Sequence, residues 1–142
     1  MEKQTTIKNK ITLKGKGLHT GQNVEVNILP AQANSGIVFK RIDLENPVLI
    51  KADAEAVTET SRGTTIESKG AKVATIEHLM AALYASNIDN ALIEISGEEV
   101  PILDGSSKYW LEAIEKSGVE ELEKERKYFC LKEIVSYVDQ EN

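Results

Sequence analysis

Residues 75–95 read TIEHLMAALYASNIDNALIEI, and this stretch predicts a helix that leads directly into a buried strand. Thr75 is a good N-cap residue, and Glu77 places a negative charge in the first turn, where it suits the helix dipole. Apolar residues then recur at helical spacing, and a Ser-Asn pair is expected to end the helix. Residues 91–95 form a short, mostly apolar run that is typical of a buried strand.

The first half of the chain predicts short strands joined by turns. Apolar and polar residues alternate over 5–13 and again over 24–28, and 37–41 is a third short run of this kind. A turn with three glycines lies between the first two runs, at 14–21. The Ser-Lys-Gly sequence at 68–70 is typical of a hairpin turn.

A second helix is expected late in the chain. Ser106 or Ser107 is expected to cap it, Trp110 contributes to its apolar face, and Gly118 is a good C-terminal stop. Residues 52–57 fit either a helix or a strand. Strands thus come first, followed by helix, strand and helix. This order predicts an α+β fold, a two-layer sandwich with a mostly antiparallel sheet and two main helices on one face.

The C-terminal region predicts a boundary between two domains. We expect residues 1–118 to form an N-terminal α+β domain and the glutamate-rich residues 119–127 to form an acidic linker. Apolar residues of one parity within 128–142 predict the first strand of a second domain that is cut short. Such an unpaired strand is expected to be disordered or to pair with another chain.

Composition excludes several classes of function. The 142 residues carry a net charge of −6 and have a pI of about 5.0, whereas a nucleic-acid-binding surface is basic, so we expect no nucleic-acid partner. No apolar run approaches the roughly 20 residues of a transmembrane segment, and the N-terminus lacks the apolar core of a signal peptide. The one cysteine, Cys130, cannot form an internal disulfide, which suits a reducing compartment. These features predict a cytoplasmic protein.

The chain has only two histidines, and each has a simpler interpretation beside the functional one. Glu77 and His78 are adjacent at the predicted helix start, where a histidine can bind a metal and a glutamate can act as the base for a water molecule. The same pair also fits a capped helix start with a hydrogen-bonded histidine. His19 lies in the glycine-rich turn, which fits either a ligand-binding loop or a plain hairpin turn.

Four short blocks give the chain a resemblance to one family. Residues 15–21 (GKGLHTG), 75–83 (TIEHLMAAL), 88–95 (IDNALIEI) and 99–107 (EVPILDGSS) are similar, in order and spacing, to motifs of the UDP-3-O-acyl-N-acetylglucosamine deacetylases. These enzymes are zinc amidases of lipid A biosynthesis in Gram-negative bacteria. The resemblance covers nearly the whole chain.

The resemblance implies an activity for the full-length enzyme and a role for several residues. Zn²⁺ is the cofactor, His78 is one of its ligands, and Glu77 is the general base. The substrate is a UDP-linked acylated glucosamine, whose N-acetyl group is released as acetate. Substrate-binding residues are expected at Leu18, His19, Thr60 and Gly63.

The same resemblance implies that these residues hold only part of an active site. In this family the other zinc ligands, a histidine and an aspartate, and a further catalytic histidine come from a second domain, and none of those motifs occurs here. A catalytic zinc usually has three protein ligands and an open position. We therefore expect a piece of a longer enzyme that is inactive without its C-terminal domain.

Two other functions stay open at this point. The chain fits a non-catalytic scaffold or interaction module that keeps the fold, and also a separate metalloenzyme built on His19, His78 and Asp104.

The motifs themselves depart mildly from the family, which often has serine at the position of Thr20. Residues 60–65 align with a family loop that lines the cleft near the acyl chain, and Arg62 with Gly63 would alter this wall, so the acyl-length preference stays open.

Overall fold

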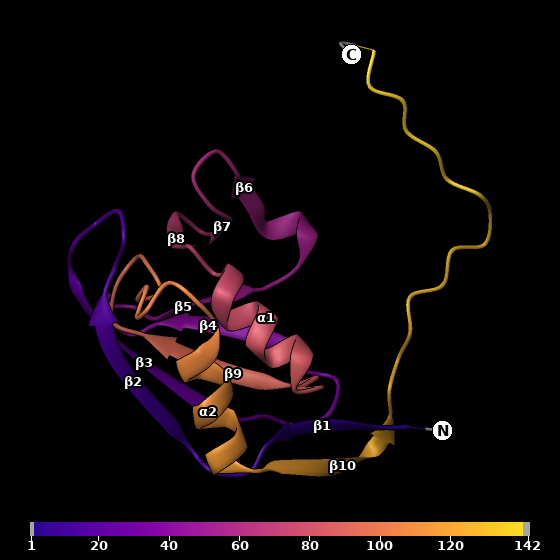
Figure 1. The fold of residues 1–142 in the computed structure, drawn as a ribbon, viewed down its shortest axis with the longest axis horizontal. Helices are drawn as coiled ribbons and strands as arrows, with labels where there is room; N and C mark the ends of the chain where they lie inside the picture. Colours follow the sequence, from indigo (N-terminus) through magenta and orange to yellow (C-terminus); the bar gives the residue numbers. More distant parts are fainter. Residues whose placement is uncertain (1, 141–142) are drawn as a thin grey trace.

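The computed structural model describes residues 2–140 (Figure 1). Its centre is a five-stranded sheet in which neighbouring strands are antiparallel, apart from the parallel pair β4 and β9. The predicted α+β class with a mostly antiparallel sheet is therefore confirmed. The strands lie in the order β2 (Ile11–Lys16), β3 (Asn23–Pro30), β9 (Ala91–Ile95), β4 (Ile37–Arg41) and β5 (Val48–Lys51).

Two helices cover one face of this sheet, as the sequence predicts. Helix α1 (Glu77–Ala85) and helix α2 (Lys108–Ser117) lie against each other in front of the sheet in Figure 1. Successive side chains of a strand point to opposite faces, so one apolar set on each strand meets the helices. The buried core includes Val26, Ile28, Phe39 and Ile93 of the sheet and Leu79, Leu83, Trp110 and Ile114 of the helices.

A smaller sheet packs at one edge of the large one. It has three antiparallel strands, β6 (Val57–Glu59), β7 (Thr65–Ser68) and β8 (Ala71–Ala74), and the turn between β7 and β8 is the predicted hairpin turn. A short 3-10 helix, η1 (Ala54–Ala56), comes before β6, so the ambiguous segment is helix in part and strand in part.

Arg41 joins the small sheet to the large one. Its side chain is nearly buried and forms an ion pair with Asp43, whose carboxylate lies 2.7 Å away. The same guanidinium donates a hydrogen bond to the backbone carbonyl of Lys72 in β8, at 2.8 Å. The hydrogen bonds with Asp43 raise the pKa of Arg41 despite its burial. The small sheet is thereby fixed to the end of β4.

The predicted cap of α1 is wrong. The N-cap residue is Ile76, and the Thr75 backbone has a φ of +58°, which a β-branched residue rarely adopts. The Thr75 hydroxyl donates to Glu99 instead of capping the helix. Ser107 does stand at the N-cap of α2, but its hydroxyl donates to the His78 carbonyl. Both hydroxyl groups therefore donate to residues distant in the sequence, and neither caps its own helix.

The predicted acidic linker is also wrong. Val119–Glu125 is strand β10, which pairs antiparallel with β1 (Lys3–Ile7) to form a two-stranded sheet. Gly118, the predicted helix stop, has a φ of +84° and leads the chain out of α2 into this strand. The glutamate side chains of β10 are exposed, so the pairing rests on backbone hydrogen bonds rather than on apolar alternation. The glutamate-rich composition of this segment is therefore compatible with a linker as well as with an exposed strand.

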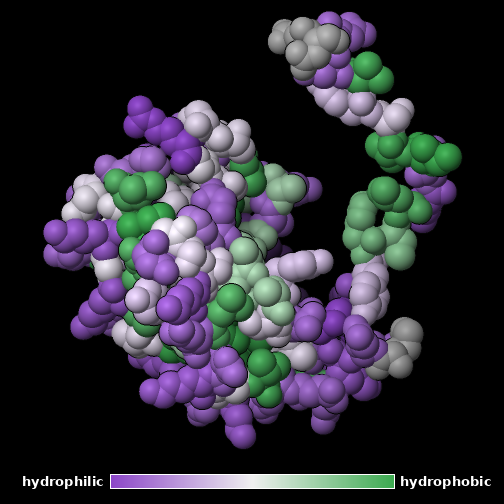
Figure 2. Space-filling view, in the orientation of Figure 1, coloured by the Kyte–Doolittle hydropathy of each residue, from purple (hydrophilic) through white to green (hydrophobic). Residues whose placement is uncertain are grey.

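The segment 127–140 contains neither helix nor strand, whereas the sequence predicts a strand beginning at Tyr128. It runs away from the sheets and is the yellow trace in Figure 1. Figure 2 shows hydrophobic surface along this segment, and its exposed apolar side chains include Phe129, Leu131, Ile134, Val135, Tyr137 and Val138.

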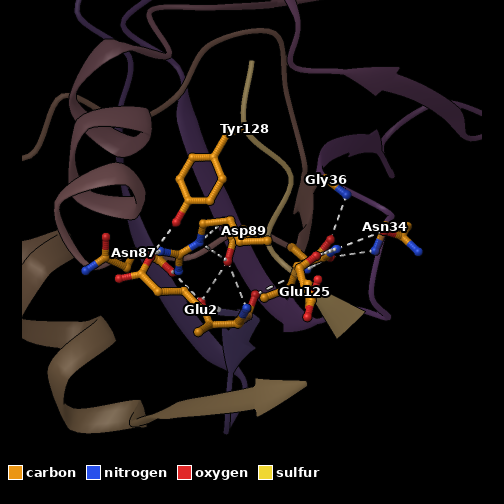
Figure 3. Close-up of polar contacts among 11 residues, drawn as sticks. Glu2, Asn34, Gly36, Asn87, Asp89, Glu125 and Tyr128 are labelled. Carbon is orange, nitrogen blue, oxygen red and sulfur yellow. Dashed lines mark hydrogen bonds and ion pairs between the residues drawn. The ribbon is translucent and has the colours of Figure 1, made fainter. Parts of the chain in front are cut away.

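A polar network holds the chain where it leaves β10 (Figure 3). The Arg126 guanidinium donates to both carboxylate oxygens of Asp89 at 3.1 Å and to Glu2 at 2.8 Å. The Tyr128 hydroxyl also donates to Glu2, at 2.5 Å. Asp89 accepts from the Thr5 amide at 2.9 Å, so the network spans β1, the turn before β9 and the end of β10.

Arg126→Met is expected to lower the free energy of unfolding by about 1–2 kcal/mol, because it removes several charge-assisted hydrogen bonds from a partly exposed group. Urea unfolding at low and at high salt measures the loss, which should shrink as salt rises. Lys124→Met removes an exposed positive charge two residues away, in β10, and is the matched control. Equal effects of the two substitutions would show that Arg126 acts through net charge alone.

Candidate active site

Glu77 opens helix α1 and faces the loop between β6 and β7. Its side-chain oxygen Oε1 accepts a hydrogen bond from the Thr64 amide. Burial raises the pKa of Glu77, but the hydrogen bonds from Thr64 and from the helix backbone outweigh burial and hold the pKa below the ordinary value of 4.5. The side chain is therefore a carboxylate at neutral pH.

Gly63 brings this loop close to Glu77. Its φ is +151°, and a Cβ built on it would lie 3.4 Å and 3.6 Å from the two carboxylate oxygens of Glu77 and 3.7 Å from the Thr75 hydroxyl. These distances are ordinary contacts, so glycine is favoured here by the positive φ with which the loop places the Thr64 amide against the carboxylate.

Gly63→Ala is expected to destabilise the chain by about 1 kcal/mol and to weaken the bond from Thr64 to Glu77, because alanine rarely adopts a φ of +151° and the backbone next to Thr64 must shift. Urea unfolding and the NMR shift of the Thr64 amide measure the two effects. Gly70→Ala is the control, since Gly70 has a φ of +78° but no atom within 4 Å of its Cβ position. The control should lose stability and leave the Thr64 amide shift unchanged.

His78 follows Glu77 and is partly buried. Its carbonyl oxygen accepts a hydrogen bond from the Ser107 hydroxyl at 2.8 Å, which ties the starts of α1 and α2 together. Within residues 2–140 no three or more His, Cys, Asp or Glu side chains are placed to hold a metal ion. His78 itself offers one imidazole to a metal ion.

His19 lies on the turn between β2 and β3 and lines a cleft. Its Nε2 atom is 3.3 Å from the carbonyl oxygen of Arg62, in the loop that contains Gly63. The cleft has a volume of about 540 Å³. Its walls come from four segments of the chain and include His19, Thr20, Arg62, Gly63, Thr75 and Glu99.

Only some of the predicted site residues lie close to one another in the structure. The loop around Gly63 contacts both Glu77 and the His19 ring, whereas the side chains of Leu18 and Thr60 are exposed. Asp104 does not join His19 and His78 in a metal cluster within residues 2–140. Its carboxylate accepts hydrogen bonds from Ser106 in an exposed turn, which is the turn chemistry that Asp-Gly suggests.

Glu99 is the site residue that sequence reasoning missed. Its side chain is 1% exposed, and its carboxylate accepts hydrogen bonds from the His19 and Thr20 amides and from the Thr75 hydroxyl. The signal available in the sequence is a charged residue directly before the apolar Val-Pro-Ile segment. A carboxylate placed there must find hydrogen-bond donors once it is buried.

The fold and the cleft define an α+β domain that presents a glutamate–histidine pair at a helix start. Residues 4–142 match the family model described as LpxC, UDP-3-O-acyl N-acetylglycosamine deacetylase, and the chain belongs to this family. The four sequence blocks that suggested the family lie within the matched residues.

Several curated relatives are similar over nearly the whole chain. A UDP-3-O-acyl-N-acetylglucosamine deacetylase of Geobacter sp. (strain M21) is 50% identical over 136 residues, which are 96% of this chain and 45% of the relative. The protein of the same name in Geotalea uraniireducens is 48% identical and is covered to 44%. The "Bifunctional enzyme LpxC/FabZ" of Bacteroides thetaiotaomicron is 47% identical over 140 residues and is covered to 30%. The chain thus spans less than half the length of these relatives.

Helices long and apolar enough to cross a membrane are absent from residues 2–140.

Proposed function

We propose that this chain supplies one half of the active site of a zinc-dependent deacetylase. The full-length enzyme removes the N-acetyl group from a UDP-3-O-acyl-N-acetylglucosamine and releases acetate, a step of lipid A biosynthesis in the cytoplasm. The observation that carries the proposal is the Glu77–His78 pair at the start of α1, in a chain of this family. The Glu77 carboxylate lies beside Gly63, which lines the cleft. The names of the relatives supply the substrate class.

Glu77 and His78 have different tasks in this proposal. Zinc, when bound, supplies a Lewis acid and lowers the pKa of water to about 7, which makes amide hydrolysis feasible at neutral pH. The His78 imidazole contributes one ligand. The Glu77 carboxylate takes the proton from the attacking water and passes it to the leaving amine. The Thr64 amide holds the Glu77 carboxylate against the loop that contains Gly63.

The cleft walls would hold the substrate. His19 and Gly63 line the cleft and are the residues of this chain that contact the sugar nucleotide or its acyl chain in this proposal. Leu18 and Thr60 are exposed beside them and would be covered when substrate or the second domain packs there. The zinc ligands still required come from residues that the relatives have beyond the matched region.

The isolated 142-residue chain is expected to release no measurable acetate from the UDP-linked substrate and to bind zinc weakly, because one imidazole cannot hold the ion. The test compares zinc per chain and acetate release for this chain and for the full-length enzyme. Stoichiometric zinc together with robust acetate release by the isolated chain would refute a site that is completed by other residues.

A non-catalytic module is the second candidate. The absence of a three-ligand group within residues 2–140 favours it for this chain taken alone. The same measurement separates the two functions, since a scaffold gains no zinc and no activity when the rest of the enzyme is present.

A further inference from the structure

Glu99 is a buried carboxylate whose hydrogen-bond donors are uncharged. Its oxygen Oε1 accepts from the His19 amide at 3.0 Å and from the Thr20 amide at 2.9 Å, and Oε2 accepts from the Thr75 hydroxyl at 2.7 Å. With 1% of the residue exposed, the charge depends on these donors, because an ion without hydrogen bonds is costly to bury. One side chain therefore joins the turn after β2 to the segment before α1.

The turn that carries His19 is built around this carboxylate. A Cβ on Gly17 would overlap Glu99 Oε1 and the Thr20 hydroxyl oxygen, so any other residue there would displace the Glu99 carboxylate. The Gly21 amide closes the turn by donating to the Gly17 carbonyl at 3.0 Å. Two successive amides, those of His19 and Thr20, point at the carboxylate as a result.

The other partner of Glu99 sets the start of α1. Thr75 has a φ of +58°, and such a conformation in a β-branched residue persists only where its surroundings enforce it. Backbone bonds hold the two segments side by side, since the Ala74 amide donates to the Glu98 carbonyl at 2.7 Å and the Val100 amide donates to the Ala74 carbonyl at 3.0 Å. The bond to Glu99 fixes the remaining freedom of Thr75, two residues before Glu77.

We propose that Glu99 is a positioning residue that maintains the shape of the cleft, because it holds the His19 turn and the segment before α1 together. Without the carboxylate, the His19 turn and the start of α1 lose their common partner. Burial raises the pKa of Glu99, but the hydrogen bonds from Thr20, Thr75 and His19 have the larger effect and hold the pKa below its ordinary value. The group is therefore ionised at neutral pH. The structural part of this proposal is that Glu99 holds the two segments together, and it does not depend on the proposed function. The catalytic part, an effect on the reaction rate, rests on the proposed deacetylase function.

The structural part is tested by amide hydrogen exchange, followed by NMR, in the 142-residue chain. In Glu99→Ala the His19 and Thr20 amides are expected to exchange on the order of 10- to 100-fold faster. This factor corresponds to the free energy that a hydrogen bond to a charged group contributes. The Val26 and Ile93 amides in the central sheet should keep their rates. Glu99→Gln keeps one oxygen for the turn and should restore most of the protection. Glu67→Gln, at an exposed position of β7, is the control for charge.

A second variant keeps the test decisive if Glu99→Ala fails to fold. Thr75→Val removes the hydroxyl and keeps the shape, so the Glu77 and His78 amide resonances should move while the Thr20 amide stays protected. Unchanged exchange at His19 and Thr20 in Glu99→Ala would overturn the proposal. Where that variant does not fold, unmoved Glu77 and His78 resonances in Thr75→Val would overturn it.

The catalytic part is tested in the full-length enzyme. Glu99→Ala is expected to lower kcat on the order of 10- to 100-fold with KM and zinc content close to those of the wild type, since a misplaced wall costs rate more than affinity. Glu99→Gln should recover most of kcat. An unchanged kcat contradicts the positioning role, whereas an inactive wild-type enzyme would refute the proposed function and leave the exchange result standing.

Discussion

Glu77→Gln is expected to slow acetate release by the full-length enzyme about 10²–10⁴-fold, which is the usual cost of losing a general base. The amide is nearly isosteric with the carboxylate, so the Thr64 amide can still donate to its oxygen and the loop around Gly63 can keep its place. Zinc per chain should stay at the wild-type value, because His78 and the other ligands are untouched. The measurements are steady-state acetate release and zinc content by atomic absorption.

Glu67→Gln is the matched control for this substitution. It removes the same charge from an exposed position of the small sheet and should leave both rate and zinc unchanged. A rate for Glu77→Gln within about tenfold of the wild type would show that another group takes the proton.

His78→Ala is expected to act through the metal. Loss of one of three protein ligands should reduce zinc per chain to a small fraction of the wild-type value, and activity should fall in proportion to zinc. Added zinc should restore part of this activity, whereas it should restore none in Glu77→Gln. The two variants are therefore distinguished by zinc content although both are impaired.

His19→Ala is the control, because His19 is the histidine that lines the cleft. His19 is exposed and its ring approaches the Arg62 carbonyl, and the family resemblance does not make it a zinc ligand. Its loss should leave zinc content at the wild-type value, whatever it does to KM. Equal zinc in the His78→Ala variant and the wild type would refute the ligand role of His78.

Much of the fold could be predicted where periodicity is strong. The strands at 37–41 and 91–95 have the predicted bounds, because alternation or a short apolar run determines which side chains enter the core. The prediction of β10 failed for the opposite reason. Its glutamates mostly face solvent, and it pairs with a strand more than 100 residues away, which no local pattern reveals.

The candidate site was less predictable than the fold. Residue types alone suggest the adjacent Glu77 and His78, but not the Thr64 amide that holds the carboxylate. Thr75 looked like a helix cap because threonine often caps helices. Its positive φ and its bond to Glu99 depend on tertiary contacts across 24 residues of sequence. Side chains that bond to distant partners are those for which local propensity gives the wrong answer.

The pairing of β1 with β10 has a consequence for how the domain is made. β1 is the first strand of the chain, and its partner ends at Glu125. A contact of such sequence separation raises the contact order, and folding slows as contact order rises. Since ribosomes add roughly 5–20 residues per second, β1 waits several seconds with an open edge while the rest of the domain is synthesised. The edge of β1 that pairs with β10 is therefore open to chaperones, and to wrong partners, until β10 has been synthesised.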